Sequence, residues 1–316
     1  MRKLHPSILL TLPVMVLLTG CKAAIPAASP PAESAAAAPA AETPTRTPES
    51  TPLTTGLSLR KIDVDGMRRT YYLYVPRGIR VQDPLPVVMV FHGYGQEGGN
   101  MVPAAGFNTL ADDEGFLVVY PNGSGSAGDS SWNAGDCCGF AFADGIDEPA
   151  FVRRILSDLG QWAAIDPRRI YATGFSNGGI LAYRLACDMA GTLAAVAPVA
   201  ATLFYDACRP SEPVSVLHIH GSADETVPVA GGGAGDTVWP PVEAGIAAWA
   251  EFDGCGPEPL TERVGIATRI YYLGCARGSA VNLYLLDDVG HRWPPEGVWP
   301  ASRTIWSFFA AHPKAQ

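Results

Sequence analysis

The sequence predicts an α/β fold, in which one domain is built on a mostly parallel, doubly wound sheet. Short apolar runs such as Pro86–Phe91 have the composition of strands that are buried on both faces. These runs alternate along the chain with stretches of helical character. With 47% hydrophobic residues and no internal repeat, the chain has the material for one large core.

The N-terminus has the composition of a targeting segment. Arg2 and Lys3 precede an apolar stretch, Ile8–Leu18, that is too short to span a bilayer comfortably. The motif Leu18-Thr19-Gly20-Cys21 then resembles a bacterial lipobox. We therefore expect residues 1–20 to be a lipoprotein signal peptide and Cys21 to carry the lipid. The alternative is an ordinary secretory signal in which Cys21 is incidental; both place the protein outside the cytoplasm, anchored to the cell envelope or secreted.

Residues 21–56 are expected to form a disordered tether behind the lipidated cysteine. Of the 35 residues from 22 to 56, 27 are Ala, Pro, Ser or Thr, which cannot bury enough apolar surface to offset the entropy of ordering. Residues 57–316 then form the folded domain. Its partners are not expected to include nucleic acid, because the net charge is −9 and no basic stripe is present.

Six cysteines follow the tether, and an even number in an exported chain suggests disulfides. Six cysteines allow 15 pairings. Order and proximity favour Cys187 with Cys208 and Cys255 with Cys275. The adjacent residues Cys137 and Cys138 remain, either as a disulfide or as two thiols. No C-x-x-C or H-x-x-x-H spacing is present, so we expect neither a metal nor another cofactor.

The secondary structure can be assigned in chain order. Two β-rich stretches, Leu57–Val64 and Thr70–Val75, flank Asp65-Gly66 and predict a hairpin. Further strands are expected at residues 86–91, 116–120, 169–173, 193–199, 214–220, 269–273 and 281–286. Helices are expected at residues 101–113, 149–164, 180–189, 241–252 and 303–311. A long loop extends to about residue 147, and three glycines at 231–233 indicate a flexible loop.

The motif Gly174-Phe175-Ser176-Asn177-Gly178 lies between an expected strand and an expected helix. Strand, sharp turn and helix with a central serine match G-x-S-x-G, the nucleophile elbow of α/β-hydrolases. The turn exposes the Ser176 hydroxyl, a weak nucleophile that needs a base within reach. Gly174 and Gly178 stand where a side chain would collide with neighbouring backbone. The predicted architecture is therefore the α/β-hydrolase fold.

The partners of Ser176 are expected in the order serine, acid, histidine, on loops after later strands. His291 is the histidine that follows the last expected strand, and Asp224 follows the strand at 214–220. Glu225 is the competing acid, and we expect it to face solvent. The oxyanion hole is expected from the backbone amides of Asn177 and Tyr94.

These pieces belong to longer motifs: Phe91-His92-Gly93-Tyr94-Gly95-Gln96, Tyr120-Pro121-Asn122-Gly123, Trp132-Asn133 through Cys137-Cys138-Gly139, residues 166–179, His218-Ile219-His220-Gly221-Ser222-Ala223-Asp224, and Gly290-His291-Arg292-Trp293-Pro294. Together they resemble the polyhydroxybutyrate depolymerase / feruloyl esterase family, the secreted esterases similar to carbohydrate esterase family 1. The resemblance covers about residues 57–311. It implies a Ser-Asp-His esterase acting on esters of hydroxyalkanoates, ferulate or acetyl groups on plant polysaccharides.

Carried over by the resemblance, the catalytic roles fall on Ser176, Asp224 and His291. The same resemblance implies Trp132 and Trp293 as walls of the substrate pocket, with core packing as the alternative. Many of the depolymerases carry a polymer-binding module that this sequence lacks, which favours soluble or oligomeric esters.

The predicted function is hydrolysis of small or polymeric esters by a serine esterase that is held to a bacterial membrane through an N-terminal lipid. Three alternatives remain: a polyester depolymerase, an α/β-hydrolase peptidase, and a non-catalytic lipoprotein that binds a polymer.

Overall fold

The computed structural model describes residues 54–234 and 237–315. The predicted signal peptide, the predicted lipidation site Cys21 and the tether up to residue 53 lie outside the described residues. The first strand begins at Gly56, one residue before the predicted start of the domain. Within the described ranges, no helix is both long and apolar enough to cross a membrane.

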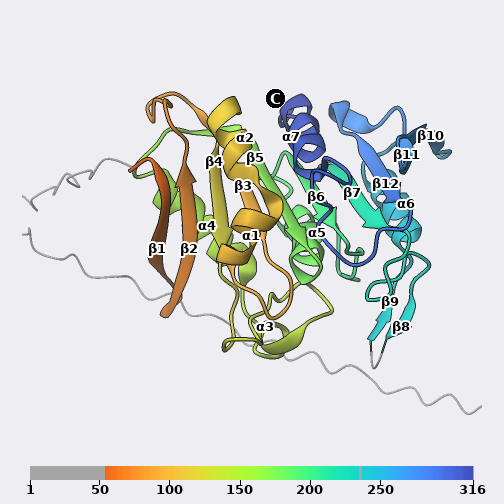
Figure 1. Cartoon of the computed structure of the whole chain (residues 1–316), viewed down its shortest axis with the longest axis horizontal. Coiled ribbons are helices and arrows are strands. Elements are labelled where there is room, and N and C mark those ends of the chain that lie inside the picture. The colour runs from red at the N-terminus through yellow and green to blue at the C-terminus, as the bar shows by residue number, and fades with distance from the viewer. Residues whose placement is uncertain (1–53, 235–236, 316) are drawn as a thin grey trace, which may run out of the picture. The chain divides into compact units, whose positions relative to one another are not determined.

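A ten-stranded sheet runs through the domain in the order β1-β2-β4-β3-β5-β6-β7-β12-β11-β10 (Figure 1). The central strands from β4 to β12 pair in parallel, and the strands at either end pair antiparallel. The sheet consists of β1 (Gly56–Val64), β2 (Met67–Val75), β3 (Leu85–Phe91), β4 (Leu117–Pro121), β5 (Ile165–Phe175), β6 (Ala195–Val199), β7 (Ser215–Gly221), β10 (Leu260–Val264), β11 (Ala267–Tyr272) and β12 (Val281–Leu286). This arrangement confirms the predicted mostly parallel sheet.

Helices cover both faces of the sheet, as double winding requires. The helices are α1 (Gly98–Ala105), α2 (Phe107–Glu114), α3 (Gly139–Ala143), α4 (Glu148–Leu159), α5 (Asn177–Asp188), α6 (Val242–Phe252) and α7 (Ala301–Ala311), with a short 3₁₀ turn at Ala276–Gly278. Buried residues of α1, α2 and α7 form one core cluster with the sheet. Buried residues of α4, α5 and α6 form the other. The apolar runs therefore have partners on both sides, which explains why they are nearly continuous in sequence.

The structure departs from the predicted elements in several places. Helix α3 lies within the predicted long loop, and the helix expected at residues 149–164 ends at Leu159. The single helix expected at residues 101–113 is two helices, because Gly106 adopts a left-handed conformation (φ 64°) and ends α1. The glycines expected to form a flexible loop instead contribute β8 (Gly232–Ala234), which pairs with β9 (Thr237–Trp239). Strand β10 was not predicted, because it is an edge strand whose residues are all exposed and it has no apolar run.

The parallel core brings three loops to one edge of the sheet. Ser176 follows β5, Asp224 follows β7 and His291 follows β12. Strands β7 and β12 are direct neighbours, and β6 separates β7 from β5. Because the carboxyl ends of parallel strands meet at the same edge, these loops meet there too.

Candidate active site

Ser176 sits in a strained turn between β5 and α5. Its φ of 53° and ψ of −121° are rare for a residue with a side chain, and its amide donates to the carbonyl of Val199 at 2.9 Å. A Cβ on Gly174 would lie 2.4 Å from the carbonyl oxygen of Gly178, and one on Gly178 would lie 2.4 Å from that of Phe91. Only glycine fits at either position, so the two glycines of the motif allow the backbone packing that exposes the serine.

Ser176, His291 and Asp224 form one hydrogen-bonded chain. The Oγ of Ser176 lies 3.0 Å from Nε2 of His291. The Nδ1 of His291 lies 2.8 Å from Oδ2 of Asp224. These are ordinary hydrogen-bond distances between a nucleophile, a base and an orienting acid. The three residues assigned from sequence are thus adjacent in space, although 115 positions separate Ser176 from His291.

The carboxyl group of Asp224 is held in its ionised form. Burial by itself would raise its pKa, but hydrogen bonds from His220, His291 and the amide of Val227 outweigh burial and lower that pKa. Its second oxygen, Oδ1, accepts from the amides of Thr226 and Val227 at 2.9 and 2.8 Å. The competing acid Glu225 is exposed, as expected.

Of the two predicted oxyanion amides, that of Asn177 lies beside Ser176 and that of Tyr94 lies in the loop after β3. Asn177 is the first residue of α5, so its amide points out of the helix N-terminus, where negative charge is stabilised. Its side chain is occupied elsewhere: Oδ1 accepts from the Trp132 amide and Nδ2 donates to the Trp132 carbonyl. Tyr94 follows His92-Gly93, and its half-exposed ring reaches Asp129 through a hydroxyl contact. Among the described residues, the amides of Tyr94 and Asn177 have no hydrogen-bond acceptor.

Both tryptophans that were predicted as pocket walls are buried. Trp132 is fully buried, packs edge-on against Phe91 and donates from its indole nitrogen to the carbonyl of His92. Trp293 is 8% exposed, and its indole donates to Ser302 Oγ on α7. Their contacts are those of packing residues. A sequence motif shows that a large side chain is present but not which way it faces.

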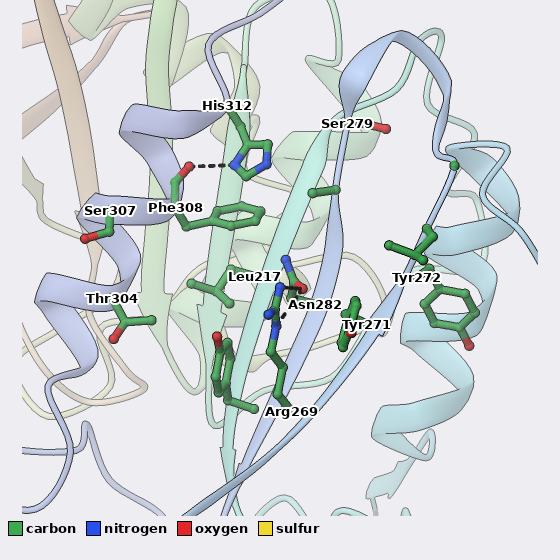
Figure 2. Close-up of a pocket in the computed structure, with 14 residues that line it drawn as sticks. Leu217, Arg269, Tyr271, Tyr272, Ser279, Asn282, Thr304, Ser307, Phe308 and His312 are labelled. Carbon is green, nitrogen blue, oxygen red and sulfur yellow. Dashed lines mark hydrogen bonds between the residues drawn. The ribbon is translucent and has the colours of Figure 1, made fainter. Parts of the chain in front are cut away.

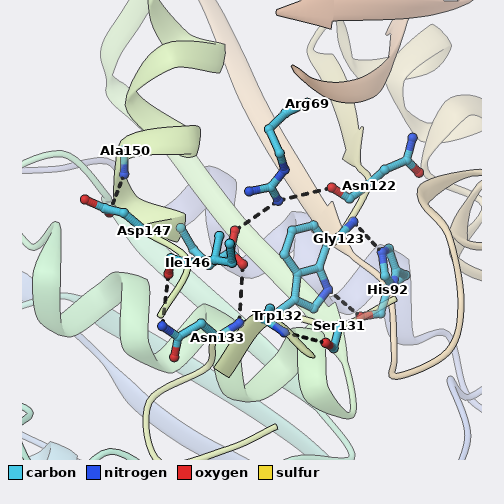
Figure 3. A network of polar contacts seen from close by, with 12 residues as sticks. Arg69, His92, Asn122, Gly123, Ser131, Trp132, Asn133, Ile146, Asp147 and Ala150 are labelled. Atoms are coloured by element: carbon cyan, nitrogen blue, oxygen red, sulfur yellow. Dashed lines mark hydrogen bonds and ion pairs between the residues drawn. The ribbon is translucent and has the colours of Figure 1, made fainter. Parts of the chain in front are cut away.

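His92 links the loop after β3, which carries Tyr94 (here the oxyanion loop), to the loop after β4, as Figure 3 shows. Its Nε2 accepts from the amide of Gly123 at 2.9 Å, and its Nδ1 faces the carbonyl of Gly93 at 2.8 Å. Burial lowers the pKa of His92 to about 4, so the imidazole stays neutral at physiological pH. Its role in the structure is to hold two loops together.

The long loop between β4 and α4 is anchored by a buried ion pair (Figure 3). The Arg69 guanidinium lies 3.1 Å from the carboxylate of Glu148 and over the ring of Phe151. Glu148 also accepts from the amide of Asn133, next to Trp132. The loop is therefore tied to the elbow through Trp132 and Asn177, and to β2 through Glu148 and Arg69.

Three disulfides join the six cysteines of the domain. Cys187 pairs with Cys208, Cys255 with Cys275, and Cys137 with its neighbour Cys138. The adjacent pair lies within the long loop, just before α3. Among the described residues, no group of three or more His, Cys, Asp or Glu is arranged to hold a metal ion.

Two of the recesses on the described surface have volumes of several hundred Å³. One, of about 620 Å³, lies beside the oxyanion loop: its lining includes Asp129, which contacts Tyr94, together with Phe140, Met67 and Ser124. The other, of about 470 Å³, lies between α7 and strands β11 and β12, where Arg269 bonds Asn282 (Figure 2). None of the predicted site residues lines either recess.

The geometry adds residues that the sequence analysis did not assign. The ring of Phe175 packs 4.8 Å from that of His291. His220 contacts Asp224 from behind, and His218 and Tyr183 continue that contact inward. The signal for the histidines was visible as His-x-His on one strand, which places both on one face of the sheet.

The comparison with known proteins decides the family. The sequence profile of the family described as Esterase PHB depolymerase matches residues 69–253, more than half of the chain. The chain belongs to this family. The resemblance expected from its motifs is thereby confirmed.

Relatives of this family member are esterases. Feruloyl esterase B of Piromyces equi is 28% identical over 226 residues, which are 68% of this chain but 41% of that protein, so the chain spans less than half of this relative. Feruloyl esterase D of Neurospora crassa is 24% identical over 266 residues, covering 78% of this chain and 83% of that one. The solved acetyl xylan esterase from Aspergillus awamori aligns with a TM-score of 0.57 at 18% identity, over 80% of this chain and 99% of that chain. That likeness concerns the fold and confirms the α/β-hydrolase architecture.

Proposed function

We propose that this protein is an exported serine esterase that cleaves carboxylic esters through an acyl-enzyme on Ser176. The observation that carries the proposal is the chain from Ser176 Oγ to His291 Nε2, at 3.0 Å, and from His291 Nδ1 to Asp224 Oδ2, at 2.8 Å. A serine at a strained turn, a base within reach and an ionised acid behind the base are the parts that nucleophilic acyl transfer requires.

In the proposed reaction, Ser176 attacks the ester carbonyl while His291 accepts the hydroxyl proton. Asp224 orients the imidazole and stabilises the imidazolium that forms. The amides of Asn177 and Tyr94 donate to the developing oxyanion, aided by the N-terminus of α5. His291 then protonates the leaving alcohol. Water, activated by the same histidine, releases the acid and restores Ser176.

The proposed substrates are feruloyl or acetyl esters of plant polysaccharide, or hydroxyalkanoate esters. The names of the relatives support the first two, and the name of the family supports the third. The recess beside the oxyanion loop offers a site for one arm of the ester, with the exposed ring of Phe140 at its edge. A polyester depolymerase is the second candidate, because Tyr94, Phe140 and Phe142 are exposed aromatic side chains near this loop.

We further propose that a lipid on Cys21 anchors the enzyme to the cell envelope through the tether of residues 21–56. Three disulfides in the domain agree with an oxidising compartment outside the cytoplasm. Metabolic labelling with a fatty-acid analogue tests the anchor: the label should enter the wild-type protein and be absent from Cys21→Ser. Equal labelling of both proteins rules out the anchor.

The catalytic proposal is tested with purified wild-type protein and Ser176→Ala. We expect a fluorophosphonate to label Ser176 and esterase activity to disappear in the variant. The substrates are methyl ferulate, acetylated xylan, short p-nitrophenyl esters and polyhydroxybutyrate film, which separate the candidate substrates. Turnover of aminoacyl amides without ester turnover would indicate a peptidase instead. Absence of both activity and labelling would leave the polymer-binding lipoprotein.

A further inference from the structure

A row of buried polar side chains continues from Asp224 into the core. His220 Nε2 lies 3.2 Å from Asp224 Oδ2 and 2.8 Å from the carbonyl oxygen of Val227. His220 Nδ1 lies 3.0 Å from Nε2 of His218, and His218 Nδ1 lies 2.7 Å from the hydroxyl of Tyr183. His218, His220 and Tyr183 are each 1% exposed, so no solvent takes part in these contacts. The proposed reaction uses none of the three.

The hydrogens along this row have one arrangement when both imidazoles are neutral. The Val227 carbonyl and the ionised Asp224 carboxylate can only accept, so His220 Nε2 carries a hydrogen and Nδ1 has a lone pair. His218 must then donate from Nε2 to that lone pair, which leaves His218 Nδ1 to accept from the Tyr183 hydroxyl. Every hydrogen in the row points toward Asp224, and such chains polarise one another.

The row also joins two elements of the proposed triad. Tyr183 is on α5, the helix that begins directly after Ser176. His218 and His220 are on β7, the strand that ends just before Asp224. With His291 bridging Asp224 and Ser176, the side chains close a ring that returns to the helix of the nucleophile. Burying two imidazoles and a phenol in an apolar core is costly unless they are fully hydrogen-bonded, and such departures from an apolar core concentrate at functional sites.

We propose that His220, supported by His218 and Tyr183, is a positioning residue that fixes the carboxylate of Asp224 toward His291. Oδ1 of Asp224 is held by two backbone amides. Oδ2 accepts from His291 and lies 3.2 Å from His220 Nε2, whose hydrogen it shares with the Val227 carbonyl. The hydrogen on His220 Nε2 thus helps to hold Oδ2 where it accepts from His291 Nδ1. This inference rests on the proposed Ser-His-Asp reaction and adds to it a group that acts through Asp224.

The test compares His220→Leu, which removes the donor, with His220→Gln, whose side-chain amide nitrogen replaces Nε2. Full-length proteins are assayed on a short p-nitrophenyl ester, and rates are divided by the fraction of Ser176 that a fluorophosphonate labels. We expect kcat of His220→Leu to fall about tenfold or more, the effect of one lost hydrogen bond to a charged group, with KM changed less than about twofold. His220→Gln should recover most of kcat.

The pH profile separates positioning from a merely structural role. A carboxylate with one donor fewer holds the His291 imidazolium more tightly. The acidic limb of kcat/KM should therefore move to higher pH in His220→Leu and stay near its wild-type position in His220→Gln. A purely structural role would lower the labelled fraction or the melting temperature and leave both kcat per labelled site and the acidic limb unchanged.

Tyr183→Phe provides a second variant that removes a single oxygen atom, so the test does not depend on the folding of His220→Leu. We expect kcat to fall about twofold to fivefold, since the lost donor acts at the far end of the row. Tyr120→Phe is its matched control: Tyr120 is also fully buried, and its hydroxyl donates to Asn108 away from the triad. Its kcat should equal that of wild type.

Wild-type kcat and acidic limb in folded Tyr183→Phe and His220→Leu would overturn the positioning role while the triad stands. A triad that fails gives a different result, because wild-type protein would then not be labelled at Ser176 and Ser176→Ala would remain active. That result overturns both proposals.

Discussion

A Cβ atom on Gly221 would lie 2.0 Å from the carbonyl oxygen of Val289. Gly221 ends β7 just before the Asp224 loop, and Val289 lies two residues before His291. The amide of Ala223 also donates to that same carbonyl at 3.0 Å. The loops that carry Asp224 and His291 are therefore packed backbone to backbone.

The first prediction follows from this contact. Gly221→Ala forces the two loops apart, and a displacement of about 1 Å at a catalytic group can cost about a hundredfold in rate. We expect kcat/KM to fall about a hundredfold in protein that still folds. Gly290→Ala is the control, because a Cβ there meets its nearest neighbour, the Ala223 carbonyl oxygen, at 3.6 Å. Equal activity of the two variants would contradict the prediction.

The second prediction concerns the choice between two adjacent acids. Asp224→Asn keeps the shape of the side chain but removes its charge and favours the wrong imidazole tautomer, so we expect kcat to fall by about 10⁴. Glu225→Gln should leave kcat within about twofold, because Glu225 is exposed. Steady-state kinetics on a p-nitrophenyl ester measures both. A larger loss of kcat in Glu225→Gln than in Asp224→Asn would show that Glu225, and not Asp224, is the acid.

The third prediction uses Asp253, a buried carboxyl group at the end of α6. Burial raises the pKa of Asp253 to about 7, while the unfolded chain has a value near 3.9. Its stabilising effect is therefore complete below pH 4 and is lost as the pH rises through 7, by about 4 kcal/mol in total. Asp253→Asn keeps the acceptor that Asp253 Oδ1 offers to the Val214 amide.

Urea unfolding of wild-type protein and Asp253→Asn at pH 5 and pH 8 measures this effect. From pH 5 to pH 8 we expect the difference in free energy of unfolding to shift in favour of the variant by about 2.5 kcal/mol. A constant difference between the two proteins across this range would show that Asp253 does not titrate as expected.

The fourth prediction compares a buried ion pair with an exposed one. Glu148→Gln leaves the guanidinium of Arg69, which is 4% exposed, without its charged partner, and breaking such a pair costs about 3–5 kcal/mol. Asp83→Asn breaks the exposed pair of Arg80 and Asp83 at 2.7 Å, and should cost less than about 1 kcal/mol. Thermal unfolding of the two variants measures both losses of stability. A smaller loss for Glu148→Gln would mean that the pair does not anchor the long loop.

Most of the sheet was predictable from sequence because its strands are buried on both faces. Leu85–Phe91 and Ser215–Gly221 are buried at every position, so their apolar runs indicate strands directly. Strand β10 could not be predicted, because its pairing with β11 depends on backbone hydrogen bonds that no side-chain pattern reports. The break at Gly106 was missed because glycine is compatible with a continuous helix as well as with its end.

The sequence by itself determined the α/β-hydrolase class, and it predicted Ser176, Asp224 and His291 as the residues that the structure brings together. Strand order and chain order are strongly constrained in this fold, so position along the chain identified the partners of the serine. The tertiary structure decided which way side chains face. It buried Trp132 and Trp293, which the motifs had suggested as pocket walls, and it placed His220 and Tyr183 behind the acid. Contacts between residues far apart in the chain depend on the packing of several elements at once, and a local pattern does not contain that information.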